Sequence, residues 1–308
     1  MDVRQLAALV AIADHGTFSA AARALFTVQS NVSSRIARLE RELGTMLVDR
    51  AGGRLTDEGV RVVERARRIL RELDDIVTDV APADGDVIGD VRLGILGTTG
   101  RWLLPRVLTA ARDRHPHLRV IVTEGSSSTL LPGLDRFNAV VIHLPIDDPS
   151  VDVEPLFAEE LVLIASPGHP LAGAEDIPLA ALAGHPLMLP PPGSALRRVL
   201  DRATSTVDVT LTATAEVDGV RLLATLVLNG QGAAIVPATA VPATTGIRPS
   251  RVIGLPPRVV ALASKGRLAS GGPTGALVDV LRETVTTLAE HQPGVRLGST
   301  AFPLSRRG

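Results

Sequence analysis

A group of short amide and hydroxyl side chains lies at the start of a predicted helix near the N-terminus. Its members are Gln29, Ser30, Asn31, Ser33 and Ser34. Gln and Asn can each form two hydrogen bonds with adenine, and Ser bonds bases less specifically. Arg38 and Arg41, further along the same helix, suit phosphate groups. Arg50 and Arg54 flank a predicted turn, where Arg suits a narrow minor groove. Each residue alone fits a solvated surface, but the set favours contact with double-stranded DNA.

The elements that would position these side chains form a compact motif. Apolar spacing predicts helices over 3–14 and 20–25, and a third over 29–43 that buries Val32, Ile36, Leu39 and Leu43. Short strands over 46–50 and 54–56, around a Gly-Gly turn, predict a hairpin. Two helices joined by a tight turn and followed by a hairpin indicate a winged helix-turn-helix.

A second set of polar groups follows predicted strands and precedes predicted helices. It comprises Thr98, Thr99, Gly100, Ser126, Ser127, Ser128, Gly193 and Ser194. Hydroxyls and free backbone N–H groups at a helix N-terminus can bind an anion, and Arg101 and His143 could add charge. The alternatives are ordinary helix capping for the hydroxyls and a structural role for His143.

The elements behind this second set alternate between strand and helix. Strands over 91–95, 118–123 and 139–143, separated by helices over 102–114 and 129–137, predict a parallel, doubly wound sheet. Further strands and helices between 161 and 290 predict a second α/β subdomain and a final helix over 275–290. The chain after Pro293 is expected to be loosely ordered.

A long helix, predicted from Thr56 to about Val80, connects the two parts. Val63, Leu70, Leu73 and Val77 belong to an apolar seam of heptad spacing, which favours pairing with a second copy of the chain. The alternative is that the seam packs on the chain's own body. Residues 81–86 form a predicted linker.

Composition narrows the function classes. The 308 residues contain no Cys, which excludes disulfides, Cys-ligated metals and a thiol nucleophile. No apolar run is long enough for a membrane span. Residues 1–71 carry 12 Arg against 8 acidic groups, and the remainder has a net charge of −5. A basic head on an acidic body indicates that a polyanion would contact the head alone. No catalytic or metal-binding motif is present, so we expect no cofactor and no metal.

The N-terminal residues resemble the signature of LysR-type transcriptional regulators. The matching positions are Leu6, Ala20-Ala21, Leu25, Gln29-Ser30, Val32-Ser33, Ile36, Leu39-Glu40, Leu43-Gly44, Leu47, Arg50, Leu55-Thr56 and Gly59. Weaker matches to the regulatory domain of that family are Leu103-Leu104-Pro105, His115-Pro116, Gly168-His-Pro-Leu-Ala172 and the segment 226–237. Asn138 departs from the usual Asp of that family, and the wing is short.

The resemblance implies a multidomain α/β protein. A winged helix-turn-helix occupies 1–60 and a linker and dimerisation helix 57–82. A periplasmic-binding-protein-like (type II) effector domain of two α/β subdomains occupies 88–292, and a tail 293–308. Subdomain I comprises 88–163 and 265–292, and subdomain II 164–264, with the chain crossing between them near 164 and 264.

We therefore expect a sequence-specific transcriptional regulator that responds to a small, polar or anionic effector, and not an enzyme. Its expected partners are double-stranded DNA of dyad symmetry, further copies in a homodimer or homotetramer, and RNA polymerase as a candidate. We expect a cytoplasmic location and no membrane contact. The alternatives are a metabolite-modifying enzyme with a DNA-binding head, or an architectural DNA binder whose cleft senses nothing.

Overall fold

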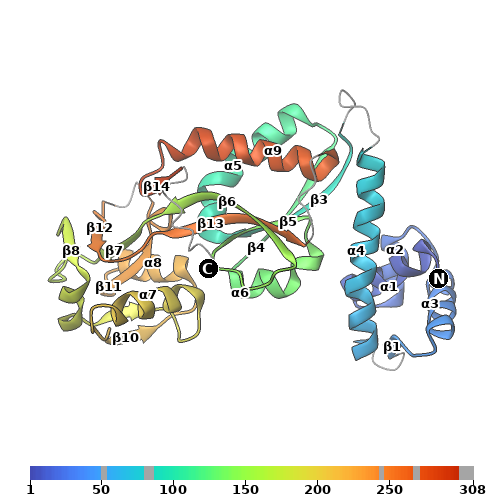
Figure 1. The fold of residues 1–308 in the computed structure, drawn as a ribbon, viewed down its shortest axis with the longest axis horizontal. Helices are drawn as coiled ribbons and strands as arrows, with labels where there is room; N and C mark the ends of the chain where they lie inside the picture. The colour runs from blue at the N-terminus through green and yellow to red at the C-terminus, as the bar shows by residue number, and fades with distance from the viewer. Residues whose placement is uncertain (50–53, 80–86, 243–245, 266–270, 298–308) are drawn as a thin grey trace. The chain divides into compact units, whose positions relative to one another are not determined.

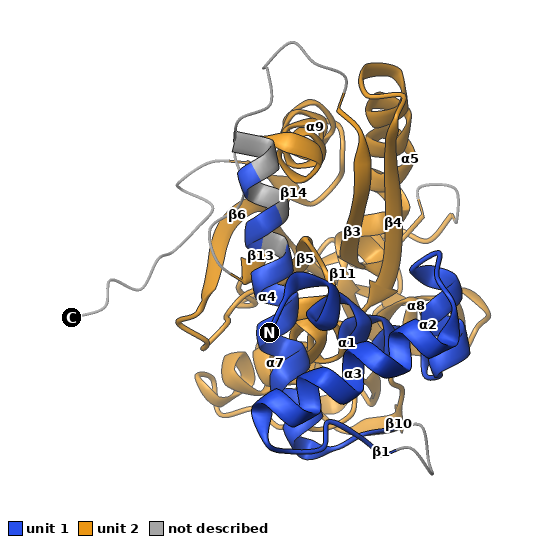
Figure 2. Ribbon diagram, turned by 90° about the vertical axis from the view of Figure 1, so that its right-hand side faces the viewer, with its two compact units in different colours: residues 1–85 blue, residues 86–308 orange. Residues whose placement is uncertain are grey.

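The computed structural model describes residues 1–49, 54–79, 87–242, 246–265 and 271–297. The chain divides into two compact units, residues 1–85 and residues 86–308, which Figure 2 distinguishes by colour. Within the described ranges, no helix combines the length and the apolar character needed to cross a membrane.

Unit 1 contains the predicted helix-turn-helix. Its elements are α1 (Val3–His15), α2 (Phe18–Ala24), α3 (Gln29–Leu43), β1 (Val48–Asp49), β2 (Arg54–Leu55) and α4 (Asp57–Asp79). Asp2 caps α1 and Thr17 caps α2, each through its side-chain oxygen, as expected for these residue types. Val32, Ile36 and Leu39 of α3 are fully buried against α1 and α2, so the opposite side of α3 faces solvent.

The wing is fixed to α3, the candidate recognition helix, by Glu40 and by a close approach at Gly59. One carboxylate oxygen of Glu40 accepts hydrogen bonds from the backbone N–H groups of Leu47 and Val48, at 2.9 and 3.1 Å. A Cβ atom at Gly59 would lie 2.0 Å from the carbonyl oxygen of Leu47, so only glycine fits there. These contacts set the position of β1 beside α3.

The long helix α4 uses its apolar positions in two ways. Val63 and Ala66 are buried in the core of unit 1, so this part of the predicted seam packs on the chain's own body. Val63 is therefore unavailable as a surface contact for another copy, contrary to the expectation. Ile69, Leu73 and Ile76 are exposed, while Leu70 is half-buried. The side chain of Val77 lies outside the described residues.

The first sheet of unit 2 contains the three parallel strands that the sequence predicts, and antiparallel strands from later in the chain make it a mixed sheet. Its order is β14-β6-β13-β5-β3-β4, with β3 parallel to β4 and β5, and β13 antiparallel to β5 and β6. The strands are β3 (Gly89–Leu96), β4 (Leu118–Gly125), β5 (Ala139–His143), β6 (Val151–Glu159), β13 (Arg258–Lys265) and β14 (Val295–Arg296).

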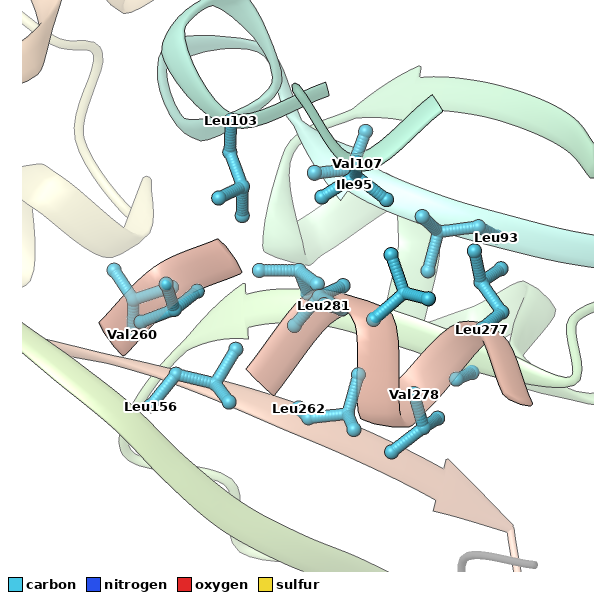
Figure 3. Close-up of a cluster of buried hydrophobic side chains, with 14 of the residues drawn as sticks. Leu93, Ile95, Leu103, Val107, Leu156, Val260, Leu262, Leu277, Val278 and Leu281 are labelled. Atoms are coloured by element: carbon cyan, nitrogen blue, oxygen red, sulfur yellow. The ribbon is translucent and has the colours of Figure 1, made fainter. Parts of the chain in front are cut away.

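Helices cover both faces of this first sheet. One face packs against α5 (Gly97–Arg114) and α9 (Gly272–Ala289), which lie side by side in Figure 1. Figure 3 shows the core between them, where Leu93, Val260 and Leu262 of the sheet meet Leu103 and Leu281 of the helices. The other face packs against α6 (Ser127–Leu130) and η1 (Leu131–Arg136).

The second sheet has the order β10-β9-β11-β7-β12-β8. Its strands are β7 (Leu161–Ala165), β8 (Asp176–Pro178), β9 (Leu187–Leu189), β10 (Ala213–Glu216), β11 (Ala233–Pro237) and β12 (Ser250–Ile253). Its helices are η2 (Leu179–Gly184), α7 (Ala195–Ser205), α8 (Val220–Leu228) and η3 (Ala238–Ala240). Leu163 faces the α7 side and Ile164 the α8 side, as alternation along a strand requires.

The chain passes between the two sheets at positions that differ from the expected ones. β6 of the first sheet is followed directly by β7 of the second, so the crossing lies at Glu160 rather than near 164. The return lies within 254–257 rather than near 264, because β13 already belongs to the first sheet from Arg258. The expected loose tail is also wrong in part, since Val295–Arg296 pairs with β6.

Candidate functional site

The exposed side of α3 carries the predicted DNA-contacting residues. Gln29, Ser30, Asn31, Ser34, Arg38 and Arg41 are exposed, and Ser33 is half-buried. The amide oxygen of Gln29 accepts a hydrogen bond from Ser19 Oγ at 2.8 Å, which orients this side chain at the start of the helix. The Asn31 amide donates to Thr27 Oγ1 at 3.0 Å. Arg54 is exposed on β2, and Arg50 lies outside the described residues.

Unit 2 contains a cavity of about 230 Å³ between its two subdomains. Ser127, Ser128 and His143, three of the predicted residues, line it from the first subdomain. Leu131, Pro132 and Pro145 add apolar surface on the same side. The second subdomain contributes Ala195, Arg198 and Arg202 from the flank of α7. The cavity thus joins hydroxyl groups, a histidine and two guanidinium groups.

Arg198 and Arg202 line the cavity, and they are not among the residues that the sequence predicts for it. They are four residues apart on α7 and therefore share one face, opposite the buried Leu196 and Leu200. That i, i+4 spacing in a predicted helix was the available signal. Among the described residues, no carboxylate lies within 4.0 Å of either guanidinium group, whereas the adjacent Arg197 pairs with Asp201 at 2.8 Å. The cavity wall therefore carries positive charge that no described carboxylate offsets.

His143 lies at the end of β5, with its side chain largely buried at the cavity. Its pKa is lowered to about 4, chiefly by burial and then by the positive charges of Arg258 and Arg198, against an opposing hydrogen bond with the carbonyl oxygen of Leu144. The ring is thus neutral near pH 7, so one of its nitrogens can donate a hydrogen bond and the other can accept one. Its backbone N–H donates to Ser127 Oγ at 3.3 Å, which links the histidine to the hydroxyl group.

The remaining predicted residues have other positions. Thr98, Thr99 and Gly100 are not in a polar turn, because α5 begins at Gly97 and buries all three. Thr98 Oγ1 accepts a hydrogen bond from Arg258 at 2.8 Å, while the buried Thr99 hydroxyl has no hydrogen-bond partner among the described residues. Arg101 donates to the carbonyl oxygen of Thr239 at 3.2 Å, and its pKa is lowered by burial and then by Arg221.

The predicted residues at the starts of α6 and α7 form local hydrogen bonds in the structure. Ser126 forms a capping box with Thr129 at the start of α6. Ser194 Oγ accepts from the backbone N–H of Arg197 at 3.3 Å and so caps α7. The carbonyl oxygen of Gly193 accepts a hydrogen bond from Arg198, which holds that side chain at the cavity.

A buried ion pair lies where the chain crosses between the subdomains. Glu159 at the end of β6 and Arg258 at the start of β13 are 0% and 5% exposed, and their charged groups approach to 2.6 Å. The second carboxylate oxygen of Glu159 accepts from the backbone N–H of Thr239 at 2.9 Å. Together with the bond from Arg258 to Thr98, this network connects both subdomains to the crossing strands.

Two family comparisons cover most of the chain. Residues 3–60 match the family described as bacterial regulatory helix-turn-helix protein, lysR family. Residues 84–286 match the LysR substrate binding domain. The first match contains the α3 surface, and the second contains the cavity and the buried ion pair.

Individual relatives agree with these matches. A probable hydrogen peroxide-inducible genes activator of Streptomyces viridosporus is 32% identical over 92% of this chain and 94% of its own length. The DNA-binding transcriptional dual regulator OxyR of Escherichia coli K12 is 32% identical over 79% of this chain and 81% of its own length.

Solved structures share the fold. A full-length OxyR variant from Pseudomonas aeruginosa has a TM-score of 0.79 at 22% identity, covering 97% of this chain and 99% of the other. Full-length CbnR complexed with its target DNA has a TM-score of 0.62 at 23% identity, covering 92% of this chain and 100% of the other. The chain therefore belongs to the LysR family of regulators: it is a DNA-binding transcriptional regulator with an effector-binding domain, and not an enzyme.

Proposed function

We propose that a small anion, bound without covalent chemistry in the cavity of unit 2, controls DNA binding by this regulator. The observation that supports this is the pair Arg198 and Arg202, which line the cavity with no described carboxylate partner. Guanidinium groups bind carboxylate or phosphate oxygens through paired hydrogen bonds. Ser127, Ser128 and the neutral His143 on the opposite wall would bond a polar group at the other end of the ligand.

The names of the relatives suggest a different signal, hydrogen peroxide. Peroxide acts on protein thiolates by oxidising them to sulfenic acid or disulfide. This sequence of 308 residues has no cysteine, so it offers no thiol for that reaction. The proposal therefore separates this chain from a thiol-based response and assigns the control to ligand binding.

The effector proposal is tested by thermal unfolding of the full chain with single probes: acetate, succinate, inorganic phosphate and hydrogen peroxide. A ligand that binds only the folded state stabilises it by about 2.7 kcal/mol at a hundredfold excess over Kd. We expect at least one of the three anions to raise Tm, and peroxide not to. The double variant Arg198→Gln/Arg202→Gln should lose the shift.

The matched control is Arg106→Gln, because Arg106 is exposed on α5 and does not line the cavity. This variant should retain the anion-dependent rise in Tm. A rise that persists in the double arginine variant would show that the anion binds elsewhere. Stabilisation by peroxide alone would contradict an anionic effector.

We further propose that α3 lies in the major groove of its DNA, with its N-terminal Gln29, Ser30 and Asn31 at base edges. Arg38, Arg41 and Arg54 would then contact phosphates. The exposure of these side chains on one side of α3 supports this arrangement. A dyad-related pair of such helices requires a dimer, and the exposed Ile69, Leu73 and Ile76 of α4 supply an apolar stripe for a second copy.

A further inference from the structure

The turn between α2 and α3 carries an aromatic side chain that the described residues of its own unit leave almost fully exposed. Phe26 is 99% exposed, whereas Phe18, Phe137 and Phe157 are half-buried or buried. Val28, two residues further along the same turn, is also exposed. Exposing a whole phenyl ring to water is unfavourable, and the folded unit gains no packing from it.

The backbone at Phe26 is unfavourable for this residue type as well. Its φ of 50° lies in the left-handed region, directly after Leu25, the residue that ends α2. Glycine or asparagine is usual at such a position, because a bulky side chain is strained there. Neither packing nor backbone preference within unit 1 therefore explains a phenylalanine at position 26.

The turn nevertheless holds Phe26 in a defined place. The backbone N–H of Phe26 donates to the carbonyl oxygen of Arg23 at 3.2 Å, and that of Thr27 donates to Ala22 at 2.9 Å. Thr27 Oγ1 also accepts from the Asn31 amide at 3.0 Å, which ties the turn to the first turn of α3. A side chain presented on such a fixed turn loses little conformational freedom when it meets a partner.

We propose that Phe26 contacts the C5-methyl group of a thymine at the edge of the base pairs that α3 contacts. In a helix-turn-helix the turn lies between the helix that crosses the DNA backbone and the helix in the major groove. The thymine methyl is the apolar feature of the major groove, and phenylalanine is among the side chains that recognise it. The exposed groups beside Phe26 on α3, Gln29, Ser30 and Asn31, are polar, which suits a DNA surface rather than an apolar protein face. This inference rests on the proposed position of α3 in the groove.

The test uses a duplex selected by the wild-type full chain from a random-sequence library. Each thymine of that duplex is replaced in turn by deoxyuridine, which removes only the C5-methyl group. At one thymine, we expect the wild type to bind about fourfold more weakly after this change, as for the loss of one buried methyl group. Phe26→Asn, which suits the left-handed backbone, should bind both duplexes equally at that position.

Three outcomes separate a failure of the thymine contact from a failure of the proposed position of α3 or from a contact between copies of the chain. Equal responses of the wild type and Phe26→Asn to every deoxyuridine would overturn the thymine contact. If Gln29→Ala also leaves the selected sequence and the affinity unchanged, the position of α3 itself is wrong. If Phe26→Asn instead changes the sedimentation mass, then the ring lies between copies of the chain and not on DNA. Phe26→Asn should unfold at the same temperature as the wild type or higher, because the described residues of its unit leave Phe26 almost fully exposed.

Discussion

At the scale of single residues, the arginines that line the cavity differ from nearby arginines in having no described carboxylate partner. Glu159 compensates Arg258, and Asp201 compensates Arg197, but no described carboxylate compensates Arg198 or Arg202. Arg198 and Arg202 are exposed, so water and salt screen part of their charge, but guanidinium groups without a carboxylate partner still attract an anion. Burial, and after it the positive charges of Arg258 and Arg198, keep His143 neutral by lowering its pKa.

The neutral state of His143 predicts an acid sensitivity of unit 2. The pKa of His143 is about 4 in the folded chain, whereas an ordinary histidine has a pKa of 6.5. Between these two pH values the unfolded chain therefore binds a proton at His143 and the folded chain does not. Stability must therefore fall as pH drops through this window, by about 2 kcal/mol between about pH 7 and about pH 5. In the variant His143→Gln, the free energy of unfolding in urea should not show this fall between about pH 7 and about pH 5.

The exposed His117→Gln is the control for this experiment and should keep the wild-type pH dependence. An anion bound in the cavity raises the pKa of a nearby imidazole, because it favours the charged form. An anion that raises Tm should thus reduce the acid sensitivity of the wild type. If His143→Gln is as acid-sensitive as the wild type, His143 is not the group responsible.

At the scale of elements, α4 has apolar residues that are buried in unit 1 and others that are exposed. Val63 and Ala66 complete the core of unit 1 with α1, while Ile69, Leu73 and Ile76 are 41%, 36% and 60% exposed. Residues 69, 73 and 76 are spaced by four and three, so they form one stripe along the helix. The heptad pattern in the sequence is continuous, but in the structure only its N-terminal end packs into the core of unit 1.

This division predicts which substitution separates copies of the chain. Leu73→Asp places a charge in the exposed stripe and should convert a dimer to a monomer in sedimentation, with unit 1 still folded. Val207→Asp, at an exposed apolar position of unit 2, is the control and should leave the mass unchanged. A Leu73→Asp protein that sediments as a dimer would rule out the stripe as the interface. The same experiment measures whether wild-type dimers associate into tetramers.

At the scale of the whole molecule, the described parts of unit 2 are connected by a polar centre. Thr98 comes from the first subdomain, Thr239 from the second, and Glu159 and Arg258 from the crossing strands. Ligand control of an effector domain requires two arrangements that the ligand stabilises differently. Because the ion pair lies at the crossing, it stabilises the arrangement seen in the structure.

The cost of breaking this centre should be large and measurable. Glu159→Ala leaves Arg258 charged and buried, which typically costs about 3–5 kcal/mol. Trp102 is the single tryptophan of the chain and packs against Phe157 of β6, so its fluorescence follows the unfolding of unit 2. Glu283→Ala breaks the exposed pair with Arg114 and should cost less than about 1 kcal/mol. Equal losses in the two variants would show that the buried pair has no special role.

Much of unit 1 and the order of elements in unit 2 could be predicted from residues that are close together along the chain. Local periodicity is sufficient for α3, whose apolar positions are three or four residues apart, and for β5 and β7, which are continuous apolar runs. The type and spacing of Gln29 to Arg41 also indicated a surface for DNA. These features depend on neighbours along the chain.

The features that join distant segments could not be predicted in this way, because they depend on how the chain packs. The strand β6 breaks the apolar alternation, and its pairing with β13 depends on residues about a hundred positions away. Arg198 and Arg202 became candidates because folding brings α7 to the wall formed by Ser127 and His143. The burial of Val63 and of Thr98 likewise depends on which segments pack over them. Burial and charge pairing are properties of the folded chain, and they determine which polar residues remain available to a ligand.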